Sequence, residues 1–142
     1  MRIRASMRTF AAEQVGNLLA RVVFELHRAA RSQDEDAIHD LRVSIRRFSQ
    51  ALRSYDGLFP PKAVKKIRRR LRSLMKTAAA VRDRDVAIGL LEKAGLPESS
   101  PLIRQLVAER KAAGRKLAEQ LRRWSRHNFS VRWREDLHLS TA

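Results

Sequence analysis

The stretch "IHDLRVSIRRF", residues 38–48, carries four large apolar residues at spacings of three and four. At 100° per residue of an α-helix, these residues and Leu52 fall within one arc of about 80°, the width of a buried helix face. Basic residues occupy the neighbouring arc; they are His39, Arg42, Arg46 and Arg53. The stretch therefore predicts an amphipathic helix with a row of positive charge beside its apolar face. Arg47 points away from this first basic row.

Apolar residues recur at helical spacing along most of the remaining chain, and no segment alternates as a strand would. Caps, prolines and glycines divide the pattern, because they begin or end helices. The expected helices cover about residues 9–31, 35–55, 61–81, 82–95 and 101–126. We predict an all-α fold, an antiparallel bundle of about five helices, in one domain over residues 1–142. Its patterned part covers about 10–126, and residues 127–142 form a weakly patterned tail.

The charge balance is strongly positive, with 31 Lys and Arg against 15 Asp and Glu, a net charge of +16. Arginine supplies 24 of the 31, and its planar guanidinium binds phosphate oxygens in pairs. An anionic, phosphorylated partner is therefore the first expectation. The absence of cysteine excludes disulfides and thiol catalysis and fits a reducing compartment. No apolar stretch is long enough to predict a membrane span.

The helix expected over 61–81 repeats the arrangement of the helix expected over 35–55, with a basic row beside an apolar face. Its second basic row consists of Lys62, Lys65, Arg69, Arg72 and Lys76, spaced by three and four. Neither row contains an acid, so like charges repel one another along each helix. If the two helices pack as antiparallel neighbours across the short "DGLFPP" connection, the two rows can face one groove that accommodates a long polyanion.

Two interpretations of these rows stay open. A row of charges on a helix is most often a solvated face. Three features favour a binding surface instead: the rows contain no acids, they border the apolar arc, and Arg110 lies in the apolar row of the helix expected over 101–126.

Other chemistry has less support in the sequence. His39 beside phosphate would keep its proton, but it shows no metal-ligand spacing with the other three histidines. No nucleophile motif, phosphate-binding glycine loop or dinucleotide motif is present, so we expect no catalytic residue, metal or cofactor. In "RDRDV", residues 82–86, we expect Asp83 and Asp85 to begin a helix and Arg82 to pair with an acid or a carbonyl.

Together, "IHDLRVSIRRF", "LFP" and "VRDRDVAIGLL" resemble the CHAD domain, the conserved histidine α-helical domain. The resemblance covers roughly residues 10–126 and implies an all-helical, non-catalytic fold that binds inorganic polyphosphate along a basic channel. It assigns the family's histidine and arginines to His39, Arg42, Arg46 and Arg47, and its Arg-Asp pair to Arg82 and Asp83. Phe48 and Ser49 replace the family's usual Leu-Arg, and Ala79 replaces its usual glycine.

The resemblance also bears on assembly, because a complete CHAD domain has two similar helical halves and this chain matches only the first. Two copies related by a two-fold axis could complete the channel, so a homodimer is a hypothesis. We expect a cytoplasmic protein, associated with polyphosphate granules.

The leading hypothesis is thus a polyphosphate-binding module. Its predicted contacts are His39, Arg42, Arg46, Arg53, Lys65, Arg69, Arg72 and Arg110, with Arg47 and Lys76 at the rim. Nucleic acid is the second candidate partner, although the aromatic content of 6% offers few platforms for base stacking. An enzyme acting on phosphoanhydrides is the third candidate, and it lacks the acidic cluster that would hold Mg²⁺.

Overall fold

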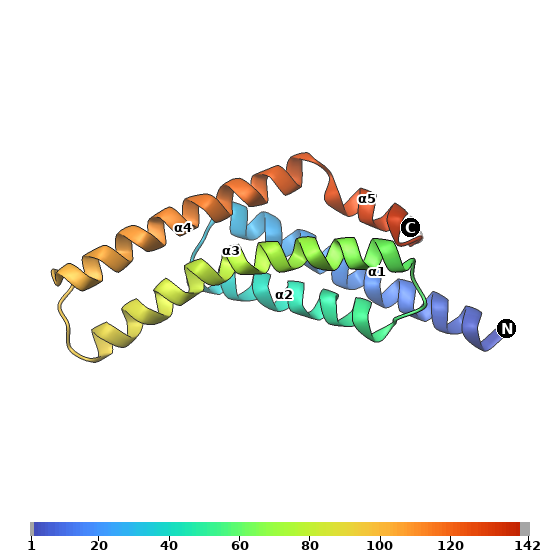
Figure 1. Ribbon diagram of the computed structural model, residues 1–142, viewed down its shortest axis with the longest axis horizontal. Helices are drawn as coiled ribbons and strands as arrows, with labels where there is room; N and C mark the ends of the chain where they lie inside the picture. Colours follow the sequence, from blue (N-terminus) through green and yellow to red (C-terminus); the bar gives the residue numbers. More distant parts are fainter. Residues whose placement is uncertain (1, 140–142) are drawn as a thin grey trace.

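Five helices joined by short connections make up the computed structural model, which describes residues 2–139. They are α1 (Arg2–Arg31), α2 (Glu35–Ser54), α3 (Pro61–Lys93), α4 (Pro101–Arg126) and α5 (Phe129–Asp136). The described residues contain no strand, which confirms the predicted all-α class. Successive long helices reverse direction, as in an antiparallel bundle (Figure 1).

The core lies where α1, α2 and α3 meet and is closed by parts of α4 and α5. The apolar arc predicted from residues 38–52 is buried as expected, with Ile38, Leu41, Phe48 and Leu52 fully enclosed. Leu19, Val22 and Leu26 of α1 and Leu71 and Leu74 of α3 belong to the same cluster. Burial of this apolar arc fixes how α2 is turned about its axis. The basic residues beside the arc therefore lie at the edge of the buried face of α2.

The ends of α2 and α3 follow from local chemistry. The Asp34 carboxylate accepts a hydrogen bond of 2.8 Å from the backbone N–H of Ala37 and thereby caps α2. Pro61 occupies the first turn of α3, where its missing N–H costs nothing. Gly95 stops that helix region with φ +93°, a left-handed conformation that glycine adopts without strain.

The predicted break near Val81 is wrong, since α3 continues from Pro61 to Lys93 as one helix of 33 residues. Residues 78–88 contain neither glycine nor proline, and the "AAA" run at 78–80 has high helix propensity. Asp83 and Asp85 therefore lie inside a helix rather than at its start. One of these two acids has another role, because Asp85 forms an ion pair with Arg110 of α4.

Residues 127–139 are also more ordered than the predicted weak tail, because they include α5. Phe129, Trp133 and Leu137 are buried and follow each other at four-residue steps. The ring centres of Phe129 and Trp133 lie 5.0 Å apart, and that of Trp133 lies 5.4 Å from Trp124. At the other end of the chain, α1 begins at Arg2 and not near residue 9. Within residues 2–139, helices therefore extend farther toward both ends than the sequence predicts.

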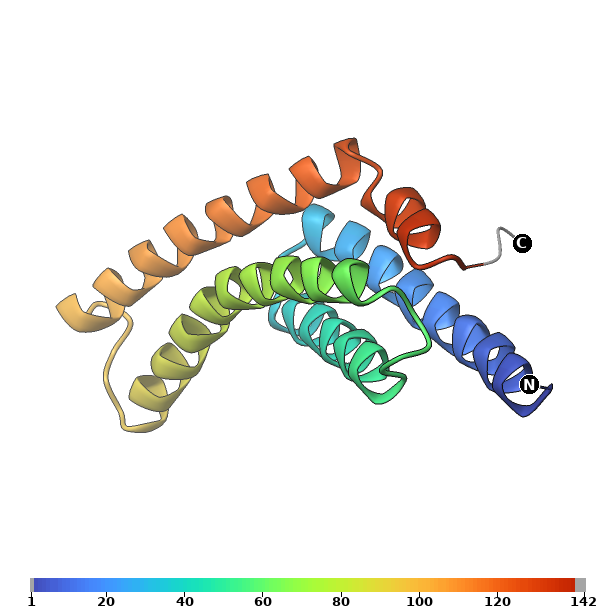
Figure 2. The same cartoon turned by 45° about the vertical axis from the view of Figure 1, so that its right-hand side comes forward.

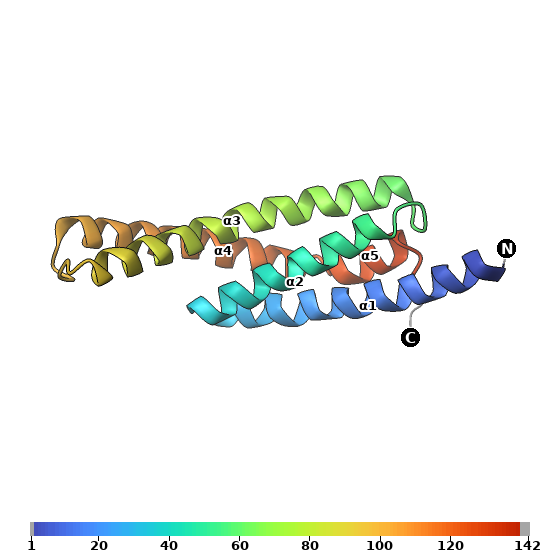
Figure 3. The same ribbon diagram turned by 90° about the horizontal axis from the view of Figure 1, so that it is seen from below.

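The long α3 lies between α2 on one side and α4 with α5 on the other (Figure 1). Its C-terminal part and the start of α4 form a hairpin that extends past the ends of α1 and α2 (Figure 2). Seen from below, α2 lies across α1 and beside the N-terminal part of α3 (Figure 3). The N-terminal half of α3 therefore has one flank that faces α2 and another that faces α4 and α5.

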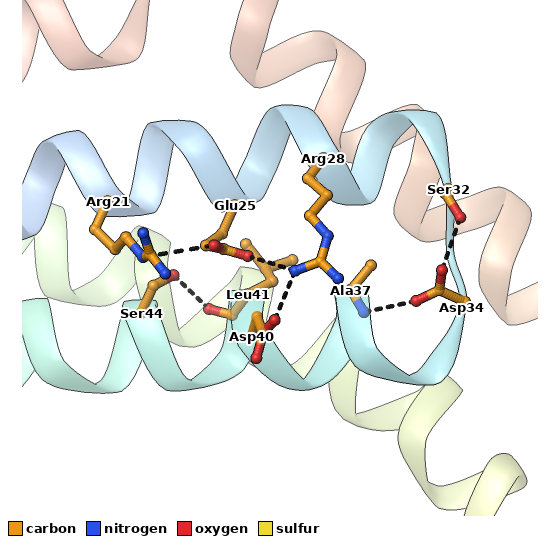
Figure 4. A network of polar contacts seen from close by, with 9 residues as sticks. All are labelled: Arg21, Glu25, Arg28, Ser32, Asp34, Ala37, Asp40, Leu41 and Ser44. Atoms are coloured by element: carbon orange, nitrogen blue, oxygen red, sulfur yellow. Dashed lines mark hydrogen bonds and ion pairs between the residues drawn. The ribbon is translucent and has the colours of Figure 1, made fainter.

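A polar network fixes α1 against α2 (Figure 4). Glu25 is 1% exposed, and its carboxylate lies 3.5 Å from the guanidinium nitrogens of both Arg21 and Arg28. Arg28 also donates a hydrogen bond of 2.6 Å to Asp40 of α2. That hydrogen bond raises the pKa of Arg28, and burial opposes it in part. Asp40, the acid of α2 that lies between His39 and Arg42 in the sequence, is thus bound to an arginine of α1.

Candidate functional site

A groove runs between α2 and α3, with an apolar floor and an arginine rim. Ile45, Leu71 and Met75 line its floor, and Ser49 and Gln50 add polar atoms. Its rim consists of Arg46, Arg53, Arg68 and Arg72, two from each helix. The groove has a volume of about 290 Å³ and no carboxylate among its lining residues. We call it the arginine groove.

The four rim arginines carry charges that no acid neutralises. Among residues 2–139, none of them forms an ion pair, although five ion pairs form elsewhere in that part of the chain. Arg46 and Arg53 are seven residues apart, which is about 10 Å along the axis of α2. The groove therefore holds a concentrated positive potential over about two helical turns.

Arg42 lies one turn before Arg46 on the same flank of α2 and is half-buried. Its Nε atom is buried without a hydrogen-bond partner in the described part of the chain. An unsatisfied buried donor costs about 1–3 kcal/mol, and more when the group is charged. Arg42 thus extends the line of unpaired arginines toward the N-terminus of α2.

Arg68 is a groove residue that the sequence analysis missed. Its Nε donates a hydrogen bond of 3.3 Å to Ser49 Oγ, so α2 orients an arginine of α3. Ser49 stands where the resemblance expects an arginine, and Arg68 contributes a guanidinium at that place. The helical wheel contained a signal for it, because Arg68 lies one turn before Arg72.

The second basic row is only partly brought to the groove. Arg72 lines it, whereas Lys62, Lys65, Arg69 and Lys76 are exposed and are not among its lining residues. The row lies opposite the buried arc of α3, and a helix can turn only one edge of such a row toward a neighbour. These four residues place positive charge on the exposed face of α3, outside the lining of the groove.

His39 and Arg47 are both exposed on α2. Neither lines the arginine groove, and neither forms an ion pair within residues 2–139. His39 lies near the N-terminus of α2, one turn before Val43. The structure therefore does not bring His39 to the groove, and Arg47 adds its positive charge on another side of α2.

Arg110 has a different role from the one its sequence position suggested. Its Nε lies 3.0 Å from Asp85 Oδ1, and its Nη2 donates a hydrogen bond to the carbonyl of Gln33. It is 24% exposed and does not line the groove. Arg110 therefore connects α4 to α3 and to the α1–α2 linker, and the structure does not bring it to the other predicted contacts.

The "RDRDV" stretch also pairs differently from the prediction. Arg84 and Asp85 make the contacts, since Arg84 lies 3.4 Å from Glu109. Arg82 forms no ion pair or side-chain hydrogen bond within residues 2–139, and Asp83 is exposed. Arg and Asp alternate in this stretch, so Arg84 and Asp85 repeat Arg82 and Asp83 two residues later. The sequence alone does not show which of the two Arg-Asp pairs makes the contacts.

Within the described residues, no three or more His, Asp or Glu side chains form a group suited to a metal ion. Over the same residues, no helix combines the length and apolar character that a membrane crossing requires. The groove offers donors for an anion: guanidinium groups, one hydroxyl and one amide.

A family model described as "CHAD domain" matches residues 3–139, nearly the whole chain. This chain belongs to the CHAD family. No curated protein and no solved structure matches it. CHAD is a binding or structural domain and is associated with polyphosphate. The match includes α5, so the CHAD-like region extends beyond the residues 10–126 that carry the sequence resemblance.

Proposed function

We propose that this CHAD protein is a non-catalytic module that binds inorganic polyphosphate through the arginine groove. The observation that supports it best is the composition of the rim: four arginines from two helices and no carboxylate. Guanidinium groups bind phosphate oxygens through charge-assisted, paired hydrogen bonds. A phosphate polymer supplies such oxygens at regular intervals along the whole groove.

The contact set that follows differs in part from the one predicted from sequence. Arg42, Arg46, Arg53, Arg68 and Arg72 contact the polymer directly. Around them, Arg47, Lys62, Lys65, Arg69 and Lys76 add long-range attraction, and His39 lies farther along α2, where it can donate a hydrogen bond to the polymer. Arg110 is left out of the direct contacts because its Nε and one terminal nitrogen already donate to Asp85 and to the Gln33 carbonyl, and because it does not line the groove.

A binding role is preferred to a catalytic one on the chemistry of the groove. Transfer or hydrolysis of a phosphoanhydride requires neutralisation of charge in the transition state and a positioned nucleophile, which acids commonly support by holding Mg²⁺. The groove lining holds arginines, one serine and one glutamine, so it can bind phosphate charge without positioning a metal. Polyphosphate incubated with the protein and Mg²⁺ should therefore release no phosphate.

A salt titration tests the proposal. Long-chain polyphosphate should bind with an affinity that falls steeply and linearly on a logarithmic salt scale, because each bound phosphate releases counterions, by analogy with nucleic acids. The test includes competition with single-stranded and duplex nucleic acid at equal phosphate concentration. Displacement of polyphosphate by nucleic acid would favour the second candidate function, a nucleic-acid-binding protein.

A homodimer is proposed as the assembly that completes a two-half channel. A two-fold axis would bring the arginine grooves of two copies to one shared surface. Polyphosphate itself would then reduce the repulsion between two strongly positive copies. Light scattering with and without polyphosphate tests this, and a monomer that binds polyphosphate tightly contradicts it.

We further propose a cytoplasmic location, at polyphosphate granules. The absence of cysteine fits a reducing compartment, and the groove fits the polymer that such granules store. A fluorescent fusion should overlap with stained granules, and a fusion with the groove arginines reversed should be diffuse. Equal overlap of both fusions would contradict the proposal.

A further inference from the structure

The first turns of α1 present three large apolar side chains to solvent. Ile3, Met7 and Phe10 are 78%, 52% and 56% exposed. Their spacing of four and three residues puts them within an arc of about 60°, over about 10 Å of helix axis. We call these three residues the apolar stripe. Apolar side chains exposed next to one another, rather than singly, indicate a surface that contacts another molecule.

Two arginines fix this end of α1 to the bundle with the apolar stripe facing outward. Arg4 Nη2 donates a hydrogen bond of 3.4 Å to the carbonyl of Gly57. Arg8 Nη2 donates hydrogen bonds of 3.0 Å to the carbonyls of Leu137 and His138. Both arginines lie about a quarter turn or more around the helix from the stripe. The end of α1 extends past the connection between α2 and α3, so the stripe lies at a protruding end of the molecule (Figure 1).

The residues beside the apolar stripe carry positive charge. At 100° per residue, Arg2 lies on one side of the stripe, and Arg4 and Arg8 lie on the other. No acid precedes Glu13 in the chain, and the three arginines form no ion pair within residues 2–139. The carbonyls that accept from two of them are neutral, so all three charges persist. An exposed apolar stripe with basic flanks is typical of helices that lie in the surface of a bilayer and bind anionic lipids.

The charge favours a bilayer over a second copy of the chain. Two copies packed stripe to stripe would bring their flanking arginines together, and like charges repel. The headgroups of anionic lipids attract the same arginines. Tyr55 lines a hollow together with the three residues of the stripe. Tyrosine is enriched where one end of the side chain is apolar and the other is hydrated, as at a bilayer surface.

We propose that the first turns of α1 bind the surface of an anionic bilayer. The apolar stripe enters the boundary between headgroups and acyl chains, which such helices reach at a depth of about 5–10 Å. Arg2 and Arg4 contact lipid phosphates on either side of it. The inference does not require the function proposed for the arginine groove, because that groove lies between α2 and α3 and the stripe belongs to α1.

Co-sedimentation of the full-length protein with vesicles tests the proposal. The vesicles consist of phosphatidylcholine with about one-third phosphatidylserine, which gives a negative surface. Ile3→Gln combined with Phe10→Gln removes two apolar side chains and no charge. This variant should need at least about tenfold more lipid for half-maximal binding, because it loses the insertion of apolar area. Wild-type binding to phosphatidylcholine alone should be weaker by at least about the same factor.

A matched control makes the same chemical change outside the stripe. Phe24→Gln combined with Leu90→Gln removes two apolar side chains that are 56% and 62% exposed, on α1 and α3. Its binding to the mixed vesicles should equal that of the wild type. Equal losses in the two double variants would overturn the proposal, since insertion of the stripe would then contribute nothing specific.

A tryptophan in the stripe reports insertion directly. Trp124 and Trp133 are buried, so their emission gives a constant background. With mixed vesicles, the emission of Phe10→Trp should shift to shorter wavelength, and lipids with brominated acyl chains should quench it, whereas the wild-type emission should stay unchanged. Absence of quenching would overturn the proposal. So would a wild-type dimer, measured by light scattering without lipid, that Ile3→Gln with Phe10→Gln converts to a monomer.

A groove variant separates this surface from the proposed polyphosphate function. Arg46→Glu combined with Arg72→Glu should alter vesicle binding no more than Arg104→Glu combined with Arg115→Glu, which makes the same charge change at exposed positions of α4. A larger loss in the groove variant would overturn the proposal by assigning vesicle binding to the groove. A wild type that binds mixed vesicles through the stripe but does not bind polyphosphate would refute the groove function alone.

Discussion

The arginine groove and the α3–α4 hairpin use the same residue type in opposite ways. In the hairpin, Arg84 lies 3.4 Å from Glu109, and Arg110 lies 3.0 Å from Asp85, so each arginine has an acid from the facing helix. In the groove, four arginines from two facing helices have no acid among their lining residues. Paired arginines connect helices, whereas unpaired arginines keep their charge for a ligand.

The difference has an energetic basis. A guanidinium bound to a partly buried carboxylate has already exchanged water for a protein partner, so an added anion gains little from it. An exposed guanidinium keeps its hydration and can exchange it for phosphate oxygens. The four groove arginines therefore reduce the stability of the free protein slightly by mutual repulsion and favour the bound state.

The largest expected effect comes from reversing the groove charges. Arg46→Glu with Arg72→Glu should weaken polyphosphate binding at least about a hundredfold, since two charge-assisted contacts of about 1.4 kcal/mol each are lost. The melting temperature should stay the same or rise slightly, because repulsion between the helices falls. Isothermal calorimetry and thermal melts measure the two quantities.

A matched pair on the hairpin controls for total charge. Arg104→Glu with Arg115→Glu makes the same change in net charge at exposed positions of α4 that form no ion pair within residues 2–139. The polyphosphate affinity of this control variant should fall by a factor of about three or less, because it loses only screened long-range attraction. Equal losses in the two double variants would show that net charge and not the groove determines binding.

The next effect separates the two regions by stability. Asp85→Ala removes the acid from the partly buried pair with Arg110, where the side chains are 10% and 24% exposed. The free energy of unfolding should fall by about 1–2 kcal/mol, because a largely enclosed guanidinium loses its partner. Polyphosphate affinity should not fall, because Arg110 lies outside the groove.

Glu109→Gln is the matched control, because the Glu109–Arg84 pair is more exposed. Exposed ion pairs contribute little, so its free energy of unfolding should change by less than about 0.5 kcal/mol. Chemical denaturation of both variants tests the contrast. A gain of polyphosphate affinity in Asp85→Ala clearly larger than that in Glu109→Gln, which removes the same charge, would return Arg110 to the binding surface.

How far the sequence predicts this molecule depends on the range of the interactions involved. The buried arc of α2, the first basic row and the all-α class follow from helical spacing, and the structure confirms the arc and the class. The break predicted at Val81 failed because acids near a presumed helix start can also pair with a distant helix. Asp85 finds its partner 25 residues later, which local capping rules do not include.

The groove itself depends on how two helices are turned toward each other. Each basic row was visible in the sequence, but only the packing decides that Arg72 lines the groove and Arg69 does not. The wheel places Arg68 one turn before Arg72, but a wheel drawn for one helix does not show the Ser49 hydroxyl on the neighbouring helix that orients Arg68. The role of Arg110 was misjudged for the same reason, since its row looked buried without showing the carboxylate opposite.

A smaller effect concerns the orientation of Arg68. Ser49→Ala removes the hydroxyl that accepts its Nε hydrogen bond, so the guanidinium samples more rotamers before binding. Polyphosphate affinity should fall by a factor of about two to five, with the free energy of unfolding within about 0.5 kcal/mol of the wild type. Ser73→Ala, at an exposed position of α3, should leave both quantities unchanged. An unchanged affinity in Ser49→Ala would show that Arg68 needs no positioning.

The smallest effect concerns an acid that neither region uses. The backbone N–H of Ala37 and then the hydroxyl of Ser32 donate to Asp34 and lower its pKa below the ordinary value of 3.8. A lowered pKa in the folded state stabilises the protein above pH 3.8, and this contribution is lost as the pH falls through the lowered pKa. Asp34→Ala should therefore lower the melting temperature by a few degrees at pH 7, and the gap should close in strong acid.

Glu35→Ala provides the comparison, because Glu35 is a first-turn acid that does not cap the helix. It should lower the melting temperature less than Asp34→Ala does at pH 7. Polyphosphate affinity should be the same in both variants, since the capping end of α2 lies about three turns before Arg46. If Asp34→Ala weakened binding as much as a groove variant, the acids of α2 would take part in ligand binding, and the separation between capping acids and unpaired arginines would fail.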